Sequence, residues 1–406
     1  MREIEGKYTI AKVFSDIIDE SAIEQIQNFC NNEVSKDSKV RVMPDVHAGS
    51  GCTIGFTSEV KDKVIPNIVG VDIGCGMITV KLGKVGINLE EVDNIIRKNI
   101  PSGKSVHEVK QIKYTKLLEL YCYRELKDTK RIERSLGTLG GGNHFIEINI
   151  DDEGNKYLVI HSGSRNLGIQ VASYYQNLAY ELHQGKDELF EAQAKLIKEY
   201  KENGKRKELQ NAIKQLKLEF KAKEVTTTKE LCYLKGQYKE KYIHDMKITQ
   251  EYANLNRKTM ANIILERLFN KKLEDFQYFQ TIHNYIDTEE MIVRKGAVSA
   301  KLGEEILIPI NMRDGSLICI GKGNEDWNFS APHGAGRLFS RNVAKSKFTT
   351  DEFIKSMKGI FTTSVNENTL DECPMAYKDI NHILNNIIPT AEVIKIIKPI
   401  YNFKAN

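Results

Sequence analysis

Clusters of glycine limit how this chain can fold, because they divide most of it into short segments. The clusters recur up to about residue 184 and again from about Phe276 to the end, where they separate short apolar runs typical of strands. One such run, Tyr157 to Ile160, ends at His161. The chain shows no regular alternation of strands and helices, which a doubly wound parallel sheet would require. The pattern therefore predicts an irregular α+β fold, with a short helix-like segment and a basic tail from Lys398 to Lys404 closing the last part.

The segment from Gln184 to Lys272 differs from its surroundings and is dominated by Lys, Glu, Gln and Leu, with no proline anywhere between Pro101 and Pro309. Two sets of apolar residues have the spacing of one helical face: Leu209, Ile213, Leu216 and Phe220, and then Ile248, Tyr252 and Leu255. Breaks are expected near Gly204 and at the threonines 226–228. We predict two or three long helices that form a projecting hairpin with a solvated, charged outer face.

The composition is that of a soluble globular protein, with 28% charged residues and a mean hydropathy of −0.41. A formal net charge of +4 permits an RNA partner without arguing for one. The sequence that begins at Met1 lacks the basic region and apolar run of a signal peptide, and no apolar stretch is long enough to cross a bilayer. The seven cysteines form no Cys-x-x-Cys pair, which argues against a disulfide framework or a four-cysteine zinc site. We predict a cytoplasmic protein with no membrane segment.

Residues able to bind a metal ion gather in short glycine-rich or polar stretches, several of them at the ends of strand-like runs. Five such residues lie in four separate stretches: Asp72, Cys75, His144, His161 and His283. Taken alone, such a histidine is more often a structural residue than a ligand, and such a cysteine is more often a buried core thiol. Together, their oxygen, sulfur and nitrogen donors suit a transition metal. Because one thiolate can bridge two ions, the site could hold one metal ion or two.

Two glycine-rich loops, Leu139–Asn143 and His333–Arg337, offer backbone N–H groups that can approach a phosphate. Neither loop matches a Walker or a Rossmann fingerprint, so both are also read as simple tight turns. His333 opens the second loop, where a neutral imidazole can attack a nucleotide α-phosphorus and form a phosphoramidate. The spacing alone does not choose between this role and a structural histidine.

Seven stretches follow one another from near residue 40 to near the C-terminus: Met43–Gly49, Val71–Met77, Gly137–Phe145, His161–Arg165, His283–Asn284, Arg294–Ala297 and His333–Arg337. In residues and order they resemble the successive motifs of the RtcB RNA ligases. The segment Tyr252–Arg257 is similar to the helical Asn-Arg segment of that family. The resemblance thus covers almost the whole chain.

The resemblance implies a site for two Mn²⁺ ions, with Asp72 and Cys75 as ligands, Cys75 bridging the ions, and His144, His161 and His283 completing the set. It implies that His333 is the nucleophile that becomes guanylylated by GTP. It places the following residues around the nucleotide: Asn143, Glu147, His283, Asn284, Asn311, Asp314, His333, Gly334, Ala335, Gly336, Arg337, Tyr377 and Lys404. Asn311 stands where many relatives carry a serine that helps to hold guanine.

The implied fold is a single RtcB-like α+β domain over residues 1–406, with a mixed β-sheet core, a central metal cleft and a helical insertion over residues 184–272. The implied reaction joins an RNA 3′-phosphate or 2′,3′-cyclic phosphate end to a 5′-hydroxyl end. GMP passes from the histidine to the 3′-phosphate and leaves when the 5′-hydroxyl attacks. The physiological RNA, the need for an accessory activator protein and the oligomeric state stay open.

Two other functions fit parts of the pattern. A metal-dependent phosphohydrolase could open cyclic phosphates without ligation, using the same metal ligands but leaving His333 and Lys404 without a task. A non-catalytic RNA-binding protein could carry a structural metal, which would more often be a closed, four-ligand zinc site. Labelling of His333 by GTP separates the ligase from the phosphohydrolase, and two metals with open positions would argue against the non-catalytic protein.

Overall fold

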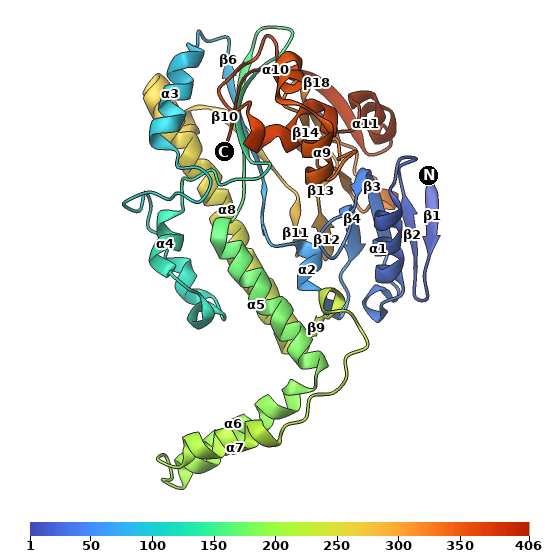
Figure 1. The fold of residues 1–406 in the computed structure, drawn as a ribbon, viewed down its shortest axis with the longest axis vertical. Coiled ribbons are helices and arrows are strands. Elements are labelled where there is room, and N and C mark those ends of the chain that lie inside the picture. Colours follow the sequence, from blue (N-terminus) through green and yellow to red (C-terminus); the bar gives the residue numbers. More distant parts are fainter. Residues whose placement is uncertain (406) are drawn as a thin grey trace.

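The computed structural model describes residues 1–405 and confirms the α+β class, with two large mixed β-sheets (Figure 1). The first sheet has six strands, ordered β1 (Arg2–Glu5), β2 (Ile10–Val13), β3 (Val40–His47), β4 (Ile54–Glu59), β12 (Ile292–Lys295) and β11 (Asn284–Asp287). β2 and β3 run parallel, whereas the other pairs are antiparallel. The apolar residues of β3 are buried, and Asp45 and His47 belong to the last three residues of the strand.

The second sheet has eight strands, and four of the five predicted metal ligands lie on or next to them: Cys75, His144, His161 and His283. Its order is β10 (Gln277–Ile282), β6 (Gly76–Gly83), β8 (Lys156–Ser162), β7 (Phe145–Ile150), β18 (Ala391–Lys404), β15 (Gly315–Gly321) and β14 (Glu305–Asn311), with β17 (Phe361–Thr362) parallel to β18. Antiparallel pairing sets Gly76 opposite Ser162 and Ile282, and Phe145 opposite His161 and Lys404. The starts of β6 and β7 therefore meet the ends of β8, β10 and β18.

Two short ladders complete the strand structure. β13 (Ala297–Ser299) pairs with β16 (Ser330–Pro332), and β5 (Lys63–Val64) pairs with β9 (Leu234–Lys235). Ala297 lies opposite Pro332, so His333, the next residue, emerges beside Gly296, whose amide donates to the His283 carbonyl oxygen at 2.7 Å. This small ladder brings the second glycine-rich loop, His333–Arg337, to the strand ends at which the predicted metal ligands lie.

The long helix α8 (Gly236–Phe269) packs against the second sheet together with α3 (Leu89–Asn99), and α5 (Arg165–His183) lies alongside it (Figure 1). Ile248 and Tyr252, two of the residues predicted to share a helical face, are buried. Met260 and Ile264 continue the apolar face into the core that includes Ile160. The second half of α8 is thus a core element.

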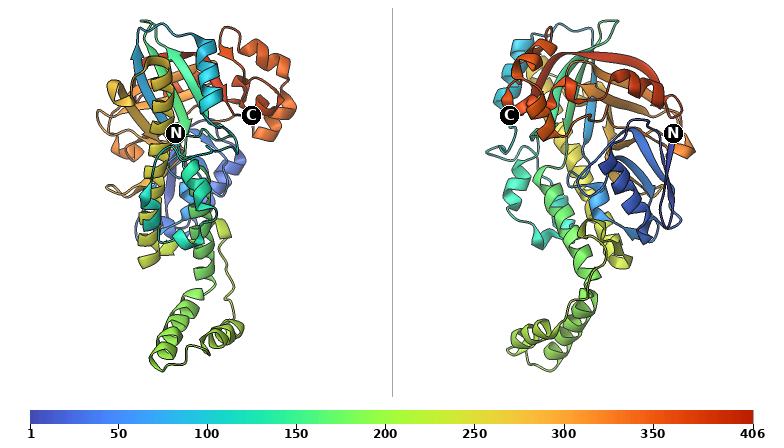
Figure 2. Two further views of the ribbon diagram at one scale, coloured as in Figure 1. Left: turned by 90° about the vertical axis from the view of Figure 1, so that its left-hand side faces the viewer. Right: turned by 45° about the vertical axis from the view of Figure 1, so that its right-hand side comes forward.

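α6 (Lys186–Glu202) and α7 (Leu209–Glu219) form a hairpin that extends away from the two sheets (Figures 1 and 2). Gly204 lies between them with a φ of 73°, a conformation that glycine adopts without steric cost. The residues 184–272 therefore divide into a projecting part, α6 and α7, and the helix α8, which packs in the body of the protein.

The remaining helices are α1 (Glu20–Cys30), α2 (Pro66–Val69), α4 (Thr129–Arg134), α9 (Arg341–Lys347), α10 (Thr350–Ser356) and α11 (Ile380–Ile387). The basic residues from Lys398 to Lys404 do not form the tail that the sequence suggested. They belong to β18, between β7 and β15, because alternate apolar side chains such as Tyr401 and Phe403 pack in the core. None of the described helices has the length and apolarity needed to cross a membrane.

Candidate active site

The five predicted metal ligands come together where the starts of β6 and β7 meet the ends of β8 and β10. Cys75 and His144 come immediately before β6 and β7, whereas His161 lies near the end of β8 and His283 follows β10. The Cys75 thiol lies 3.4 Å from His144 Nε2 and 3.3 Å from His161 Nε2. His161 Nε2 and His283 Nε2 are 3.4 Å apart, and Asp72 Oδ2 is 3.0 Å from His144 Nε2.

These donors form two groups that share one thiol. One contains Cys75, His161 and His283, the other Asp72, Cys75 and His144, and within each group the ligand atoms lie within 4.8 Å of one another. Burial, reinforced by neighbouring positive groups, holds the pKa of His161 and His283 well below the usual range, so their imidazoles are neutral and carry a lone pair. The donor set therefore fits divalent transition metal ions, with Cys75 placed to bridge two of them.

The Cys75 thiol needs a positive partner to ionise. Burial and the nearby Asp72 carboxylate both raise its pKa well above the ordinary value. A bound cation reverses this cost, because metal binding deprotonates a coordinating thiol. The buried guanidinium of Arg257 acts in the same direction and lowers the pKa of the thiol.

A hydrogen bond to the backbone sets the orientation of the His144 ring. His144 Nδ1 lies 2.9 Å from the carbonyl oxygen of Leu139, to which Nδ1–H donates. That tautomer leaves the lone pair on Nε2, the nitrogen that faces Asp72 and Cys75. In a metal-binding histidine, a hydrogen bond from the ring nitrogen that does not bind the metal fixes the orientation of the ring.

Asn256 and Arg257 of α8 tie the ligand-bearing segments together from behind. The Asn256 side chain accepts from the Gly137 amide at 2.8 Å and donates to Ser162 Oγ at 3.1 Å. Arg257 Nη1 donates to the carbonyl oxygens of Gly74 and Ser162 at 2.7 and 2.8 Å. Both side chains are fully buried. The helical Asn-Arg segment thus positions the turn before Cys75, the loop before His144 and the end of β8.

We expect Arg257→Met to weaken metal binding although Arg257 touches no metal. Loss of a partner that orients metal ligands costs about 10–100-fold in metal affinity. Isothermal titration with Mn²⁺ measures this directly. Lys258→Met on the same helix is the matched control, because Lys258 lies over the Tyr278 ring instead. Equal Mn²⁺ affinity in wild type and Arg257→Met would contradict the positioning role.

A buried carboxylate holds His333. Asp45 Oδ2 accepts from both His333 Nδ1, at 2.6 Å, and the His333 backbone amide, at 3.0 Å, and Asp45 is completely buried. With Nδ1–H donating to Asp45, the lone pair of His333 lies on Nε2. Gly336, at a φ of 75°, lets the loop approach so closely that a Cβ there would lie 2.3 Å from the Asp45 carbonyl oxygen. The sequence alone predicted no role for Asp45.

His333 also adjoins the metal-ligand cluster, since its ring centroid lies 4.9 Å from that of His283. Both rings line a cavity of about 770 Å³. Twelve of the thirteen predicted nucleotide residues line it, all except Asp314. Asp314 instead accepts from Asn311 Nδ2 at 2.8 Å and pairs with the Arg313 guanidinium at 2.8 Å. It therefore sits behind Asn311, whose side chain it orients.

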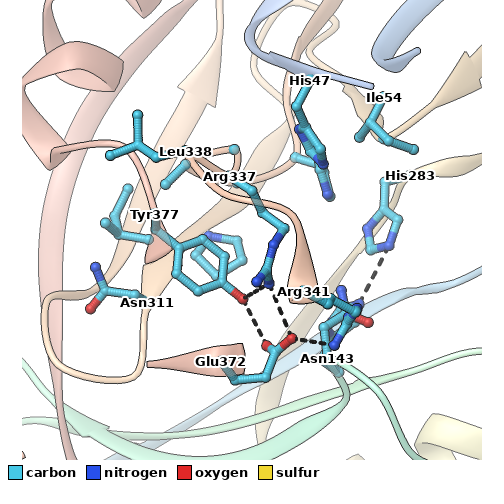
Figure 3. Close-up of a pocket in the computed structure, with 18 of the residues that line it drawn as sticks. His47, Ile54, Asn143, His283, Asn311, Arg337, Leu338, Arg341, Glu372 and Tyr377 are labelled. Atoms are coloured by element: carbon cyan, nitrogen blue, oxygen red, sulfur yellow. Dashed lines mark hydrogen bonds and ion pairs between the residues drawn. The ribbon is translucent and has the colours of Figure 1, made fainter. Parts of the chain in front are cut away.

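One side of this cavity contains a carboxylate surrounded by cations (Figure 3). Glu372, 3% exposed, pairs with Arg341 at 2.7 Å, with Lys404 at 2.9 Å and with Arg337 at 3.3 Å. The Tyr377 hydroxyl donates to it at 2.7 Å. Burial alone would raise the pKa of Glu372, but Lys404, Arg341 and Arg337 outweigh it and lower the pKa to about 2. Glu372 thus joins three predicted nucleotide residues into one network.

We expect Glu372→Gln to lower the free energy of unfolding by about 3 kcal/mol at pH 7, because it leaves buried cations without their counter-charge. The folded pKa lies below the unfolded value of about 4.3. The carboxylate's contribution is therefore present above about pH 4.3 and is lost as the pH falls toward 2. Denaturant unfolding at pH 7 and at pH 3.5 should show the difference shrinking in acid. Glu59→Gln, which breaks a more exposed pair with Lys61, should cost under about 0.5 kcal/mol at both pH values.

A second carboxyl group, Glu147, lines the same cavity in a different environment. Burial raises its pKa to about 7, against the opposing hydrogen bonds from Asn149 and Asn402. Those amides donate at 3.2 and 2.6 Å. Lys404 Nζ lies 3.4 Å from the Asn143 carbonyl oxygen and so links this wall to the Glu372 network. Of these two carboxyl groups, Glu372 is therefore charged at pH 7, whereas Glu147 is readily protonated.

Comparison with known proteins settles the family. The family described as tRNA-splicing ligase RtcB matches residues 25–126 and 119–405. The chain belongs to the RtcB family. The RNA-splicing ligase RtcB of Escherichia coli is 31% identical over 392 residues, which cover 87% of each chain. The tRNA-splicing ligase RtcB of Methanococcus maripaludis is 26% identical over 468 residues, covering 94% of this chain and 90% of that one. The resemblance drawn from the motifs is thereby confirmed, and with it the assignment to a family of ligase enzymes.

Four residues of this RtcB-family site were missed by reasoning from the sequence: Asp45, His47, Arg341 and Glu372. Asp45 and His47 lie within the Met43–Gly49 motif, so their position was known but their roles were not. Glu372 gives a weaker signal, an acid five residues before Tyr377. Only the fold shows that this carboxylate meets Arg337 and Lys404.

Proposed function

We propose that this chain is a GTP- and Mn²⁺-dependent RNA ligase that joins 3′-phosphate or 2′,3′-cyclic phosphate ends to 5′-hydroxyl ends through a guanylylated histidine. The observation that carries the proposal is the placement of His333. Its Nδ1 is held by buried Asp45, and its ring lies next to His283 of the candidate metal-ligand cluster, in the same cavity that Arg337, Arg341 and Lys404 line. A structural histidine would need neither neighbour.

In the first proposed step, His333 Nε2 attacks the α-phosphorus of GTP and pyrophosphate leaves. Asp45 supports this step, because a carboxylate on Nδ1 orients the ring and stabilises the positive charge that develops on it. The loop from Gly334 to Gly336 presents backbone N–H groups beside the reacting phosphate. GMP then passes to the RNA 3′-phosphate, and the 5′-hydroxyl displaces it.

Asp72, Cys75, His144, His161 and His283 are the residues proposed to hold two Mn²⁺ ions, with Cys75 between them. Such ions offset the negative charge of the phosphates. Preference for manganese rests on the family, since affinity order alone would favour other divalent ions. The donor set and its overlap at one thiol support the pair of ions.

The guanine is proposed to lie on the side of the cavity bounded by Asn311, Tyr377 and Lys404. Lys404 is oriented by Glu372 and can donate to a base oxygen, whereas Asn311 offers both a donor and an acceptor. Asn311 is in turn held by Asp314. An amide held in this way can take the place of the serine found in many relatives.

Ligation of defined RNA ends tests the proposal. One strand carries a 3′-phosphate, the other a 5′-hydroxyl, and the protein is supplied with Mn²⁺ and GTP. Joined product that requires GTP and is absent with ATP supports the ligase. Conversion of a 2′,3′-cyclic phosphate to a monophosphate without joining would favour the phosphohydrolase instead, and binding of RNA without any reaction would favour a non-catalytic protein.

The proposal places the reaction in the cytoplasm. All seven cysteines are buried and free, and none lies in a disulfide. Free thiols, and a thiolate metal ligand above all, persist in a reducing compartment.

A further inference from the structure

Lys378, two residues before α11, is a buried lysine without a carboxylate at ion-pair distance among residues 1–405. Its amine donates instead to three backbone carbonyl oxygens, those of Ile17, Pro44 and Val46, at 3.0, 3.0 and 2.9 Å. Burial of an ammonium group is costly even when hydrogen bonds compensate it. An apolar side chain would fill the same space without that cost, so packing alone does not account for this amine.

Two of the three carbonyl groups belong to the residues on either side of Asp45, the carboxylate that holds His333. Asp45 accepts from His333 through Oδ2 alone, because Oδ1 has no hydrogen-bond partner within residues 1–405. The position of the carboxylate therefore depends on the backbone that carries it. The Lys378 amine fixes that backbone both before and after Asp45.

The backbone of Lys378 holds the loop of the other partner. Its amide donates to the carbonyl oxygen of Gly336, three residues after His333, at 3.0 Å. The preceding residue, Tyr377, forms an isolated β-bridge with Arg337. Lys378 thus joins the loop that carries the proposed nucleophile to the segment that carries its carboxylate partner.

The amine keeps its proton at neutral pH. Burial lowers the pKa of Lys378 to about 8, although the Asp45 and Asp19 carboxylates act in the opposite direction. At pH 7 the group is therefore mainly an ammonium, which has the three donors that the three carbonyl oxygens require. Lys378 does not line the cavity, so any effect on a bound nucleotide must pass through its neighbours.

We propose that Lys378 is a positioning residue for guanylylation, which holds the Asp45 carboxylate against His333 Nδ1 and so aims Nε2 at the reacting phosphorus. The inference rests on the proposed function and adds to it a residue that acts through Asp45. Without the amine, the backbone on both sides of Asp45 loses its anchor. A displacement of about 1 Å in a reacting group can cost about 100-fold in rate.

The rate at which α-labelled GTP labels the protein, measured with Mn²⁺ and without RNA, tests the proposal. Each molecule then takes one label, so the rate constant does not depend on how much of the protein is correctly folded. We expect Lys378→Met to lower the maximal rate constant by about 100-fold. The half-saturating GTP concentration and the Mn²⁺ affinity should stay within about twofold of wild type, because an interaction made only in the transition state is lost.

A double variant separates a residue that acts through Asp45 from one that acts independently. Asp45→Ala removes the group that Lys378 is proposed to position. Adding Lys378→Met to Asp45→Ala should therefore slow labelling by less than about twofold more, since coupled residues are not additive. Slowing by the product of the two single effects would overturn the inference.

Lys378→Gln guards against misfolding of Lys378→Met. Its two amide donors on a shorter side chain cannot satisfy three carbonyl oxygens, so this variant should also label slowly. His382→Ala is the matched control, because His382 Nε2 contacts the same Pro44 carbonyl oxygen at 3.2 Å and lies outside the cavity. It should label at the wild-type rate.

Wild-type rate constants in Lys378→Met and Lys378→Gln would overturn the inference and leave the proposed function intact. Equal slowing in His382→Ala would also overturn it, because any contact with this backbone would then have the same effect. Wild-type protein that takes no label would remove the proposed function and this inference with it.

Discussion

Cys75→Ala is expected to abolish ligation and to lose bound metal. Cys75 is the residue common to both groups of candidate ligands, so its removal leaves His161 with His283 on one side and Asp72 with His144 on the other. Two protein ligands hold a divalent ion poorly, because open positions must then be filled by water. We expect Mn²⁺ affinity to fall by more than about 100-fold, beyond the loss caused by an orienting partner.

Metal content after equilibrium dialysis against Mn²⁺, together with the rate of RNA joining, measures both consequences. Cys319→Ala is the matched control, because Cys319 is equally buried but packs among apolar side chains away from the cluster. It should keep full metal content and activity, with a modest loss of stability from the smaller side chain. A Cys75→Ala protein that retains two Mn²⁺ per chain would show that the thiol bridges nothing.

The candidate metal ligands could be predicted from the sequence because each lies in a short stretch with its own signal. Cys75, His144 and His283 immediately precede or follow a strand, and glycines mark several of these turns. What the sequence could not supply is the register. Only the pairing of Gly76 with Ser162, and of Phe145 with His161, brings these residues, far apart in the chain, to adjoining strand ends.

The buried partners of site residues were harder to predict, because their signals are not local. Glu372 becomes meaningful only when β18 brings Lys404 to it. Asp45 acts on a histidine 288 positions away in the chain. The same limit explains the segment from Lys398 to Lys404, whose basic composition suggested a tail. Its alternate apolar residues pack in the core, so tertiary packing overrides the charge pattern.

His333→Ala is expected to take no label from α-labelled GTP while binding Mn²⁺ as wild type does. Among residues 1–405, only His333 combines an imidazole nitrogen facing the cavity with a buried carboxylate on its other nitrogen. His47 is held by a backbone carbonyl group, and His161 and His283 face each other among the candidate metal ligands. Because His333 is not a member of either ligand group, its loss should leave metal affinity unchanged. Denaturing electrophoresis after incubation with labelled GTP and Mn²⁺ reads the first effect, and titration reads the second.

A graded variant and a distant control sharpen this result. Asp45→Asn keeps the size of the side chain but removes the charge that supports a cationic ring, and such a change at a histidine–carboxylate pair lowers rates by up to about 10⁴-fold. His183→Asn replaces a histidine that contacts the Tyr233 backbone amide outside the cavity, and should label normally. Label that is acid-labile in wild type, faint in Asp45→Asn and absent in His333→Ala would identify a phosphoramidate on His333. Undiminished label in His333→Ala would move the nucleophile elsewhere, and the pairing with Asp45 would then be structural.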